Sequence, residues 1–64
     1  MNYAKFFHEH SGEQISVKMT DGELFSGKLF AYSSAEDNEP DPESIVVDHT
    51  ELFTNEIDKI EVIG

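Results

Sequence analysis

Carboxylates are the reactive side chains that gather most densely in this sequence. The segment 34–44, "SAEDNEPDPES", carries two prolines and five acidic side chains, which are Glu36, Asp37, Glu39, Asp41 and Glu43. Carboxylate oxygens can bind calcium, attract a basic partner or simply keep a connecting loop in water. An EF-hand calcium loop needs alternating ligands, a central glycine and a distant glutamate, and the segment lacks that pattern. We therefore predict a solvated connection first, a recognition surface for a basic partner second, and a metal cage last.

Histidine and serine side chains form no zinc-binding or catalytic pattern. His8 and His10 stand two residues apart in a predicted helix, so they point to different faces. His49 lies in a predicted turn, whereas zinc needs three or four converging ligands. The serines occur in no nucleophile motif, and a chain this small offers no cleft in which loop carboxylates could act as acids or bases. We expect no enzyme activity, no catalytic residue, no metal, no cofactor and no small-molecule substrate.

The charge balance narrows the class of partner. The chain has four lysines, no arginine and fourteen carboxylates, which gives a formal net charge of −10. Nucleic acids and acidic membranes are bound largely through Lys and Arg, so both partners are disfavoured. No export signal is visible, and no stretch approaches the roughly 20 apolar residues of a membrane span. We expect a cytoplasmic protein whose partner is another protein or a second copy of itself.

Size favours self-association. A domain of 64 residues buries only about 60% of the surface of its unfolded chain, and small domains usually gain stability from disulfides, metals or partner chains. The sequence contains no cysteine. A homo-oligomer is therefore the natural source of extra burial.

Residues 2–11 are predicted to form a short helix. Asn2 can cap its start, and Gly12 can end it in the left-handed region. One helical face carries side chains at spacings of three and four, namely Tyr3, Phe6, Phe7 and His10. A helix this short is not stable alone in water. It must dock its aromatic face on a sheet.

From Glu13 onward every second residue is apolar, and this alternation is typical of strands with one buried face. The first predicted strand carries Ile15, Val17 and Met19, and the Asp21-Gly22 pair predicts a two-residue hairpin turn. A long second strand runs to Ser33. It places Phe25, Gly27, Leu29 and Ala31 on one face and Ser26, Lys28, Phe30 and Tyr32 on the other. Gly27 predicts a sharp bend within it.

After the acidic loop, residues 34–43, three short strands complete the chain. They cover residues 44–48, 51–54 and 58–63, and a single helical turn capped by Asn55 precedes the last. Five short strands close best as a small barrel, because closure removes exposed edges. The prediction is one mainly β domain over residues 1–64, with the helix covering an open end of the barrel.

Three aromatic side chains are candidates for a partner contact, since Phe and Tyr are enriched at interfaces. They are Phe30, Tyr32 and Phe53. The alternative is that the bend in the second strand brings Phe30 and Tyr32 beneath the helix or over the rim of the barrel. The predicted partner-binding set combines these aromatics with the five loop carboxylates.

The run "ISVKMTDGELFSGKLFAYS" resembles the first motif of the Sm-like family. The matching features are the alternating apolar residues, Asp21-Gly22, Gly27, Leu29 and Tyr32. The resemblance covers residues 2–33 and implies a five-stranded SH3-like barrel of Sm type. Sm-like proteins bind uridine-rich RNA through an Asp and an Asn after this motif and through a later Arg-Gly pair. This sequence has Ser33 in place of that Asp. Asn38 could match the Asn, but the acidic loop lengthens its distance from the motif. The chain has no arginine, so the Arg-Gly pair is missing.

The tail "ELFTNEIDKIEV" is similar in pattern to the ends of acidic Sm-like proteins that inhibit the Rho termination factor by covering its RNA site. The whole chain also resembles small acidic bacterial proteins of this fold that have no assigned activity. The function most consistent with the charge and composition of the chain is a non-enzymatic protein-interaction or regulatory module that self-associates. The alternative is a divergent Sm-like protein that binds single-stranded RNA.

Overall fold

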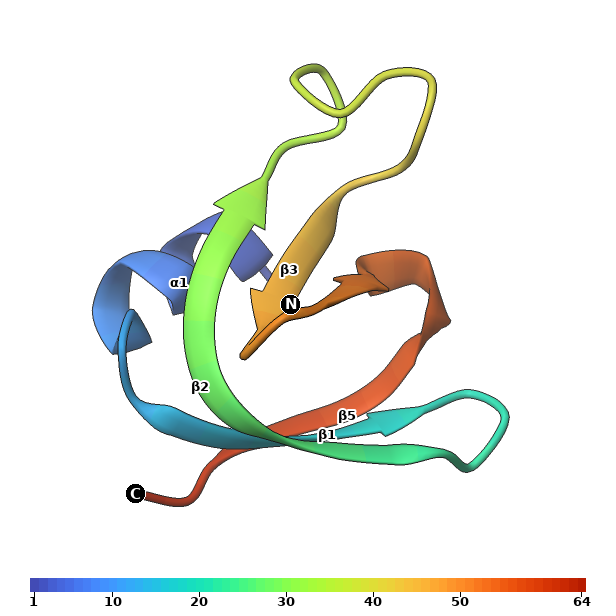
Figure 1. The fold of residues 1–64 in the computed structure, drawn as a ribbon. Coiled ribbons are helices and arrows are strands. Elements are labelled where there is room, and N and C mark those ends of the chain that lie inside the picture. The colour runs from blue at the N-terminus through green and yellow to red at the C-terminus, as the bar shows by residue number, and fades with distance from the viewer.

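The computed structural model describes all residues from 1 to 64 and shows one helix followed by five antiparallel strands (Figure 1). The strands form one sheet in the order β4-β3-β2-β1-β5. The predicted mainly β class is therefore confirmed. No helix of the structure is long and apolar enough to cross a bilayer. The elements are α1 (Tyr3–His10), β1 (Gln14–Met19), β2 (Leu24–Ser33), β3 (Ser44–Val47), β4 (Thr50–Phe53), the 3₁₀ turn η1 (Thr54–Glu56) and β5 (Ile57–Val62).

The sheet is strongly bent but not closed. The first part of β2 pairs with β1 and its second part pairs with β3, so the curved β2 joins the two halves (Figure 1). The edge strands β4 and β5 are not hydrogen-bonded to each other. The predicted closed barrel is wrong in this respect, because η1 turns the chain away from β4 and β5 then follows β1. The Thr20 amide donates to the Glu56 carbonyl at 2.8 Å and ties η1 to the β1–β2 turn.

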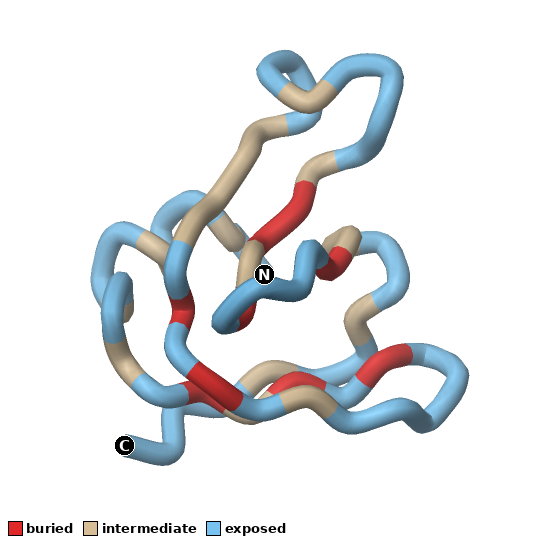
Figure 2. The backbone as a smooth tube through the Cα atoms, in the orientation of Figure 1, coloured by how far each residue is buried: buried red, intermediate tan, exposed pale blue.

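The buried residues lie on the strands that make up the bent sheet, and the core that they form is small (Figure 2). Its members come from β1 to β4 and are Ile15, Val17, Met19, Leu29, Ile45, Val47 and Leu52. The alternation predicted for β1 is confirmed, since its three apolar side chains are buried and the residues between them are not. Around this core pack partly buried apolar side chains, which include Phe6 and Phe7.

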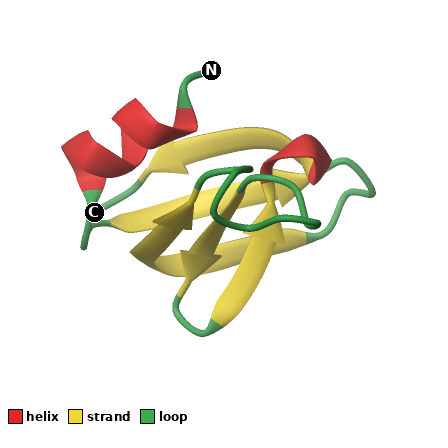
Figure 3. Ribbon diagram, turned by 90° about the horizontal axis from the view of Figure 1, so that it is seen from above, coloured by secondary structure: helices red, strands yellow, loops and turns green.

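Helix α1 forms as the sequence predicts. The Asn2 side-chain oxygen accepts from the Lys5 amide at 3.0 Å, and Gly12 has a φ of +84° in the left-handed region. No α1 residue is fully buried, so the helix is held by the partial burial of Phe6 and Phe7. It lies against one end of the bent sheet, while η1 lies at the other end (Figure 3).

Two turns differ from their predictions. The Met19 amide donates to the Glu23 carbonyl, so the β1–β2 loop has three residues instead of two, and of these three only Gly22 has a positive φ. A two-residue type I′ turn would need a positive φ at both central positions. In η1, Asn55 is not the cap: the turn follows Phe53 without any side-chain cap.

Gly27 is buried in β2, close to the point at which the pairing of β2 passes from β1 to β3. A Cβ atom at Gly27 would overlap the carboxylate of Asp48. That carboxylate accepts a hydrogen bond from the Lys28 amide at 2.9 Å. Asp48 itself has a φ of +55° in the tight turn between β3 and β4. The glycine therefore permits a close approach between β2 and this turn.

Candidate functional site

The acidic loop between β2 and β3 is built from hydrogen-bonded turns. The Ser34 carbonyl accepts from the Asn38 amide at 3.0 Å, and the Ser34 hydroxyl accepts from the Asp37 amide at 3.2 Å. A second turn follows, in which the Asp41 amide donates to the Asn38 carbonyl at 2.8 Å. The loop is thus a connection between strands, as predicted, with a defined backbone path.

Asn38 ties this loop to its base. Its side-chain NH₂ donates to the Pro42 carbonyl at 2.8 Å and also lies within 3.4 Å of the Ser44 hydroxyl and 3.3 Å of a Glu51 oxygen. The buried Ser44 donates its own hydroxyl to Glu51 at 2.7 Å. The amide that the Sm-like resemblance would assign to RNA is therefore engaged within the loop.

Glu43 is the most connected carboxylate of the loop. The Tyr32 hydroxyl donates to one of its oxygens at 2.5 Å, and the Thr54 hydroxyl donates to the other at 2.9 Å. The hydrogen bond to Glu43, then burial and the nearby negative charges, raise the pKa of Tyr32 to about 12. Burial and the charge of Glu43 also raise the pKa of Tyr3. Glu43 thus links β2, η1 and the end of the loop.

The predicted partner-binding residues divide into two groups. Tyr32, Phe53 and Glu43 are half-buried, and the Tyr32 ring stacks on Phe7 at 6.2 Å beneath α1. The accessible members are the other loop carboxylates and Phe30, whose exposed fraction is 67%. The β2–β3 ladder shifts between Leu29 and Ala31, which turns Tyr32 toward the core. The prediction that Phe30 and Tyr32 share a face is therefore wrong.

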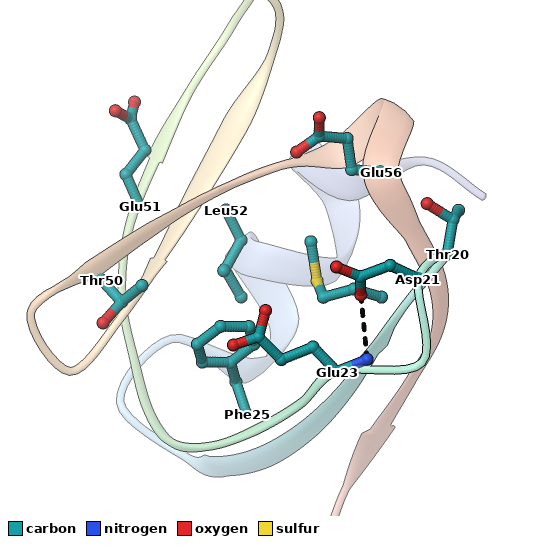
Figure 4. Close-up of a pocket in the computed structure, with 9 residues that line it drawn as sticks. Thr20, Asp21, Glu23, Phe25, Thr50, Glu51, Leu52 and Glu56 are labelled. Carbon is teal, nitrogen blue, oxygen red and sulfur yellow. Dashed lines mark hydrogen bonds between the residues drawn. The ribbon is translucent and has the colours of Figure 1, made fainter.

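A groove that the sequence did not reveal opens between the β1–β2 turn, β4 and η1 (Figure 4). Its volume is about 300 Å³. The floor is apolar and consists of Met19, Phe25 and Leu52. Thr20 and Thr50 line its sides, and four carboxylates surround it: Asp21, Glu23, Glu51 and Glu56. We call this feature the acidic groove.

The groove carboxylates have no cationic partner in the chain. The one ion pair between permanently charged side chains joins Lys59 to Glu61 at 2.8 Å, and His10 lies within hydrogen-bonding distance of Glu13 at 3.3 Å. No group of three or more His, Asp or Glu side chains is arranged to hold a metal ion. An apolar floor with unpaired carboxylates above it suits a ligand that has an apolar stem and a positive head, as Lys and Arg side chains do.

Three of the four lysines lie on strands of the sheet, and two of these three are direct neighbours. Lys18 on β1 lies directly opposite Lys59 on β5 and also opposite Leu24 on β2. These three side chains form one row across the outer face of the sheet, which we call the lysine strip. Leu24 is 69% exposed, and a hollow of about 180 Å³ lies beside it. Lys28 falls on the same face by strand alternation.

No family model matches the chain, and neither a curated protein nor a solved structure matches it.

Proposed function

We propose that this protein is a non-enzymatic interaction module that self-associates and binds a basic protein segment. The observation that supports this function best is the acidic groove, whose apolar floor is surrounded by carboxylates without ion-pair partners. The exposed loop carboxylates and the net charge of −10 extend the negative electrostatic potential of the groove over the rest of the surface. Such a field speeds the encounter with a basic partner and favours its correct orientation.

Self-association is supported by what the fold leaves uncovered. Only seven apolar residues form the buried core, so further burial against a second chain would add substantially to stability. The edge strands β4 and β5 carry backbone groups that no neighbouring strand pairs. We also infer a divergent Sm-type architecture, which is supported by the short helix, the bent β2 and the 3₁₀ turn before the last strand.

Single-stranded RNA binding is the second candidate, and the observation in its favour is the gathering of Lys18, Lys28 and Lys59 on one face. Two observations disfavour RNA binding. The chain has no arginine, and Asn38 is already hydrogen-bonded within the acidic loop. RNA binding draws its affinity from phosphate neutralisation, which three lysines in a strongly negative domain supply poorly.

Fluorescence anisotropy can test the proposal with three labelled probes: a peptide of alternating Arg and Leu, the same peptide with Glu for Arg, and a uridine-rich oligonucleotide. We expect only the basic peptide to bind, with an affinity that falls as salt is added. Glu23→Gln with Glu56→Gln should weaken binding, whereas the helix variant Glu9→Gln should not. Tighter binding of the oligonucleotide than of the basic peptide would favour the RNA function instead.

A further inference from the structure

The lysine strip lowers the stability of the isolated chain, and no contact within the chain accounts for it. Lys18 and Lys59 face each other directly across neighbouring strands, and like charges in that position are destabilising. Lys59 forms an ion pair with Glu61, and the hydrogen bond to Glu61 and the negative charge of Glu61 raise the pKa of Lys59. Lys18 forms no ion pair in the chain. A pair of lysines that destabilises the monomer would be relieved by carboxylates from a partner, so the strip is a candidate contact surface.

The acidic groove has the complementary properties. Three of its carboxylates, Asp21, Glu23 and Glu56, belong to the β1–β2 turn and η1, whereas the carboxylate of Glu51 is bonded to Ser44 and Asn38. The strip offers the ammonium group of Lys18 and that of Lys59, which is shared with Glu61, and its Leu24 matches the apolar floor of the groove. The groove opens at the ends of the β1–β2 turn, β4 and η1, whereas the strip lies on the outer face of β1, β2 and β5. Leu24 points away from the groove, although its neighbours Glu23 and Phe25 line it. A chain therefore cannot place its own strip in its own groove.

We propose that the lysine strip of one copy docks into the acidic groove of a second copy. Leu24 enters against the floor of the partner's groove, and the ammonium groups of Lys18 and Lys59 meet its carboxylates. This inference rests on the self-association proposed above and specifies its interface. The contact joins two different surfaces, so it is heterologous, and a pair of copies keeps one free groove on one copy and one free strip on the other. Assembly then proceeds head to tail.

The net charge of −10 on each copy does not prevent this contact. At physiological ionic strength the screening length is about 8 Å, so charges far from the interface interact weakly. Contacts between the strip and the groove are shorter than that distance and partly shielded from water. The interface therefore depends on local complementarity, which makes it sensitive to single charge reversals.

Sedimentation velocity over a range of concentrations can test the interface with Lys18→Glu in the strip and Glu23→Lys in the groove. Each variant should weaken self-association by about tenfold or more, since an attractive contact becomes repulsive. The double variant, and an equimolar mixture of the two single variants, should restore association because opposite charges meet again. Lys5→Glu and Glu9→Lys make the same charge changes on α1 and should leave association unchanged.

Loss of folding is separated from loss of contact by thermal unfolding. Lys18→Glu removes the like-charge pair with Lys59 and should raise the unfolding midpoint, so its loss of association cannot arise from misfolding. If the variants and the α1 controls associate equally, the proposed interface is wrong, and self-association through β4 and β5 remains. If the wild-type chain stays monomeric but binds the basic peptide, self-association is wrong and only the basic-partner function remains.

Discussion

Glu43 shows how a single acidic residue becomes part of the fold instead of the partner surface. Its carboxylate accepts from the Tyr32 and Thr54 hydroxyls, and its carbonyl accepts from the Thr54 amide at 2.9 Å. These bonds hold the end of the acidic loop to β2 and to the beginning of η1. Nothing in the spacing of the five loop carboxylates distinguishes Glu43 from the other four. Only its position beside Tyr32 does so.

The raised pKa of Tyr32 predicts a loss of stability at high pH. The ordinary pKa is 10.0 and the folded value is about 12, so the folded state favours the neutral hydroxyl. This contribution is complete below pH 10.0 and is lost as the pH rises toward about 12. Urea unfolding across this range should show a falling free energy of unfolding. In Tyr32→Phe the decline should be shallower, and an equal slope in both proteins would contradict the assignment.

Gly27→Ala should destabilise the protein by about 1–3 kcal/mol, since the new methyl group competes with Asp48 for space. In the background of Asp48→Gly, which removes that carboxylate, the same change should cost much less. Urea unfolding of the four proteins gives the coupling between the two sites. If the alanine costs as much in both backgrounds, the role of Asp48 is incorrect, and backbone bending alone would explain the glycine.

At the scale of elements, α1 is the part that depends most on its contacts. It has eight residues, none of them buried, and a helix of that length is unstable in water. Its stability comes from Phe6 and Phe7, which pack on the core, and from the stacking of Phe7 on Tyr32. The strands β1 and β2, by contrast, supply four of the seven core residues. We therefore expect α1 to open more readily than the sheet.

Phe7→Ala should release α1 without unfolding the sheet. Hydrogen exchange measured by NMR should show that the amides of residues 6–10 lose protection, while those of β1 and β2 keep it. The cost in global stability should be about 2 kcal/mol, below the range for a fully buried Phe because Phe7 is half-buried. Phe30→Ala is the matched control, since that ring is exposed and its loss should leave α1 protected.

At the scale of the whole molecule, charge is the dominant feature. The chain has fourteen carboxylates and only four lysines, and one Lys–Glu ion pair forms. A compact chain with this imbalance is destabilised by its own repulsion. The same imbalance makes it a strong attractor of basic segments, so the property that weakens the fold also favours the proposed binding.

Added salt should therefore stabilise the protein. Screening reduces the repulsion among the carboxylates, and few attractive pairs exist to be weakened. Each kcal/mol gained should raise the melting temperature by about 4–8 °C in circular dichroism. A variant with the exposed carboxylates Glu36, Asp37, Glu39 and Asp41 replaced by their amides should melt higher at low salt and respond less to salt. A melting temperature that falls with salt would show that the ion pairs dominate.

The amino-acid sequence by itself determined the elements of this protein. The cap at Asn2, the aromatic face of α1 and the alternation in β1 depend on neighbouring residues only, and the structure confirms them. The loop at residues 34–43 was equally clear, because prolines and carboxylates disfavour regular structure. Bounds of strands agreed to within about two residues, which is the usual uncertainty of such limits.

Tertiary structure alone decided which surfaces exist. The acidic groove collects side chains from β1, β2, β4 and η1, and the lysine strip collects them from β2, β1 and β5. Neither set has a spacing that marks it, because strand register and the path of η1 bring its members together. The ladder shift after Leu29 turned Tyr32 inward and left Phe30 outside. Pairing between distant strands sets these positions, and local sequence carries little information about it.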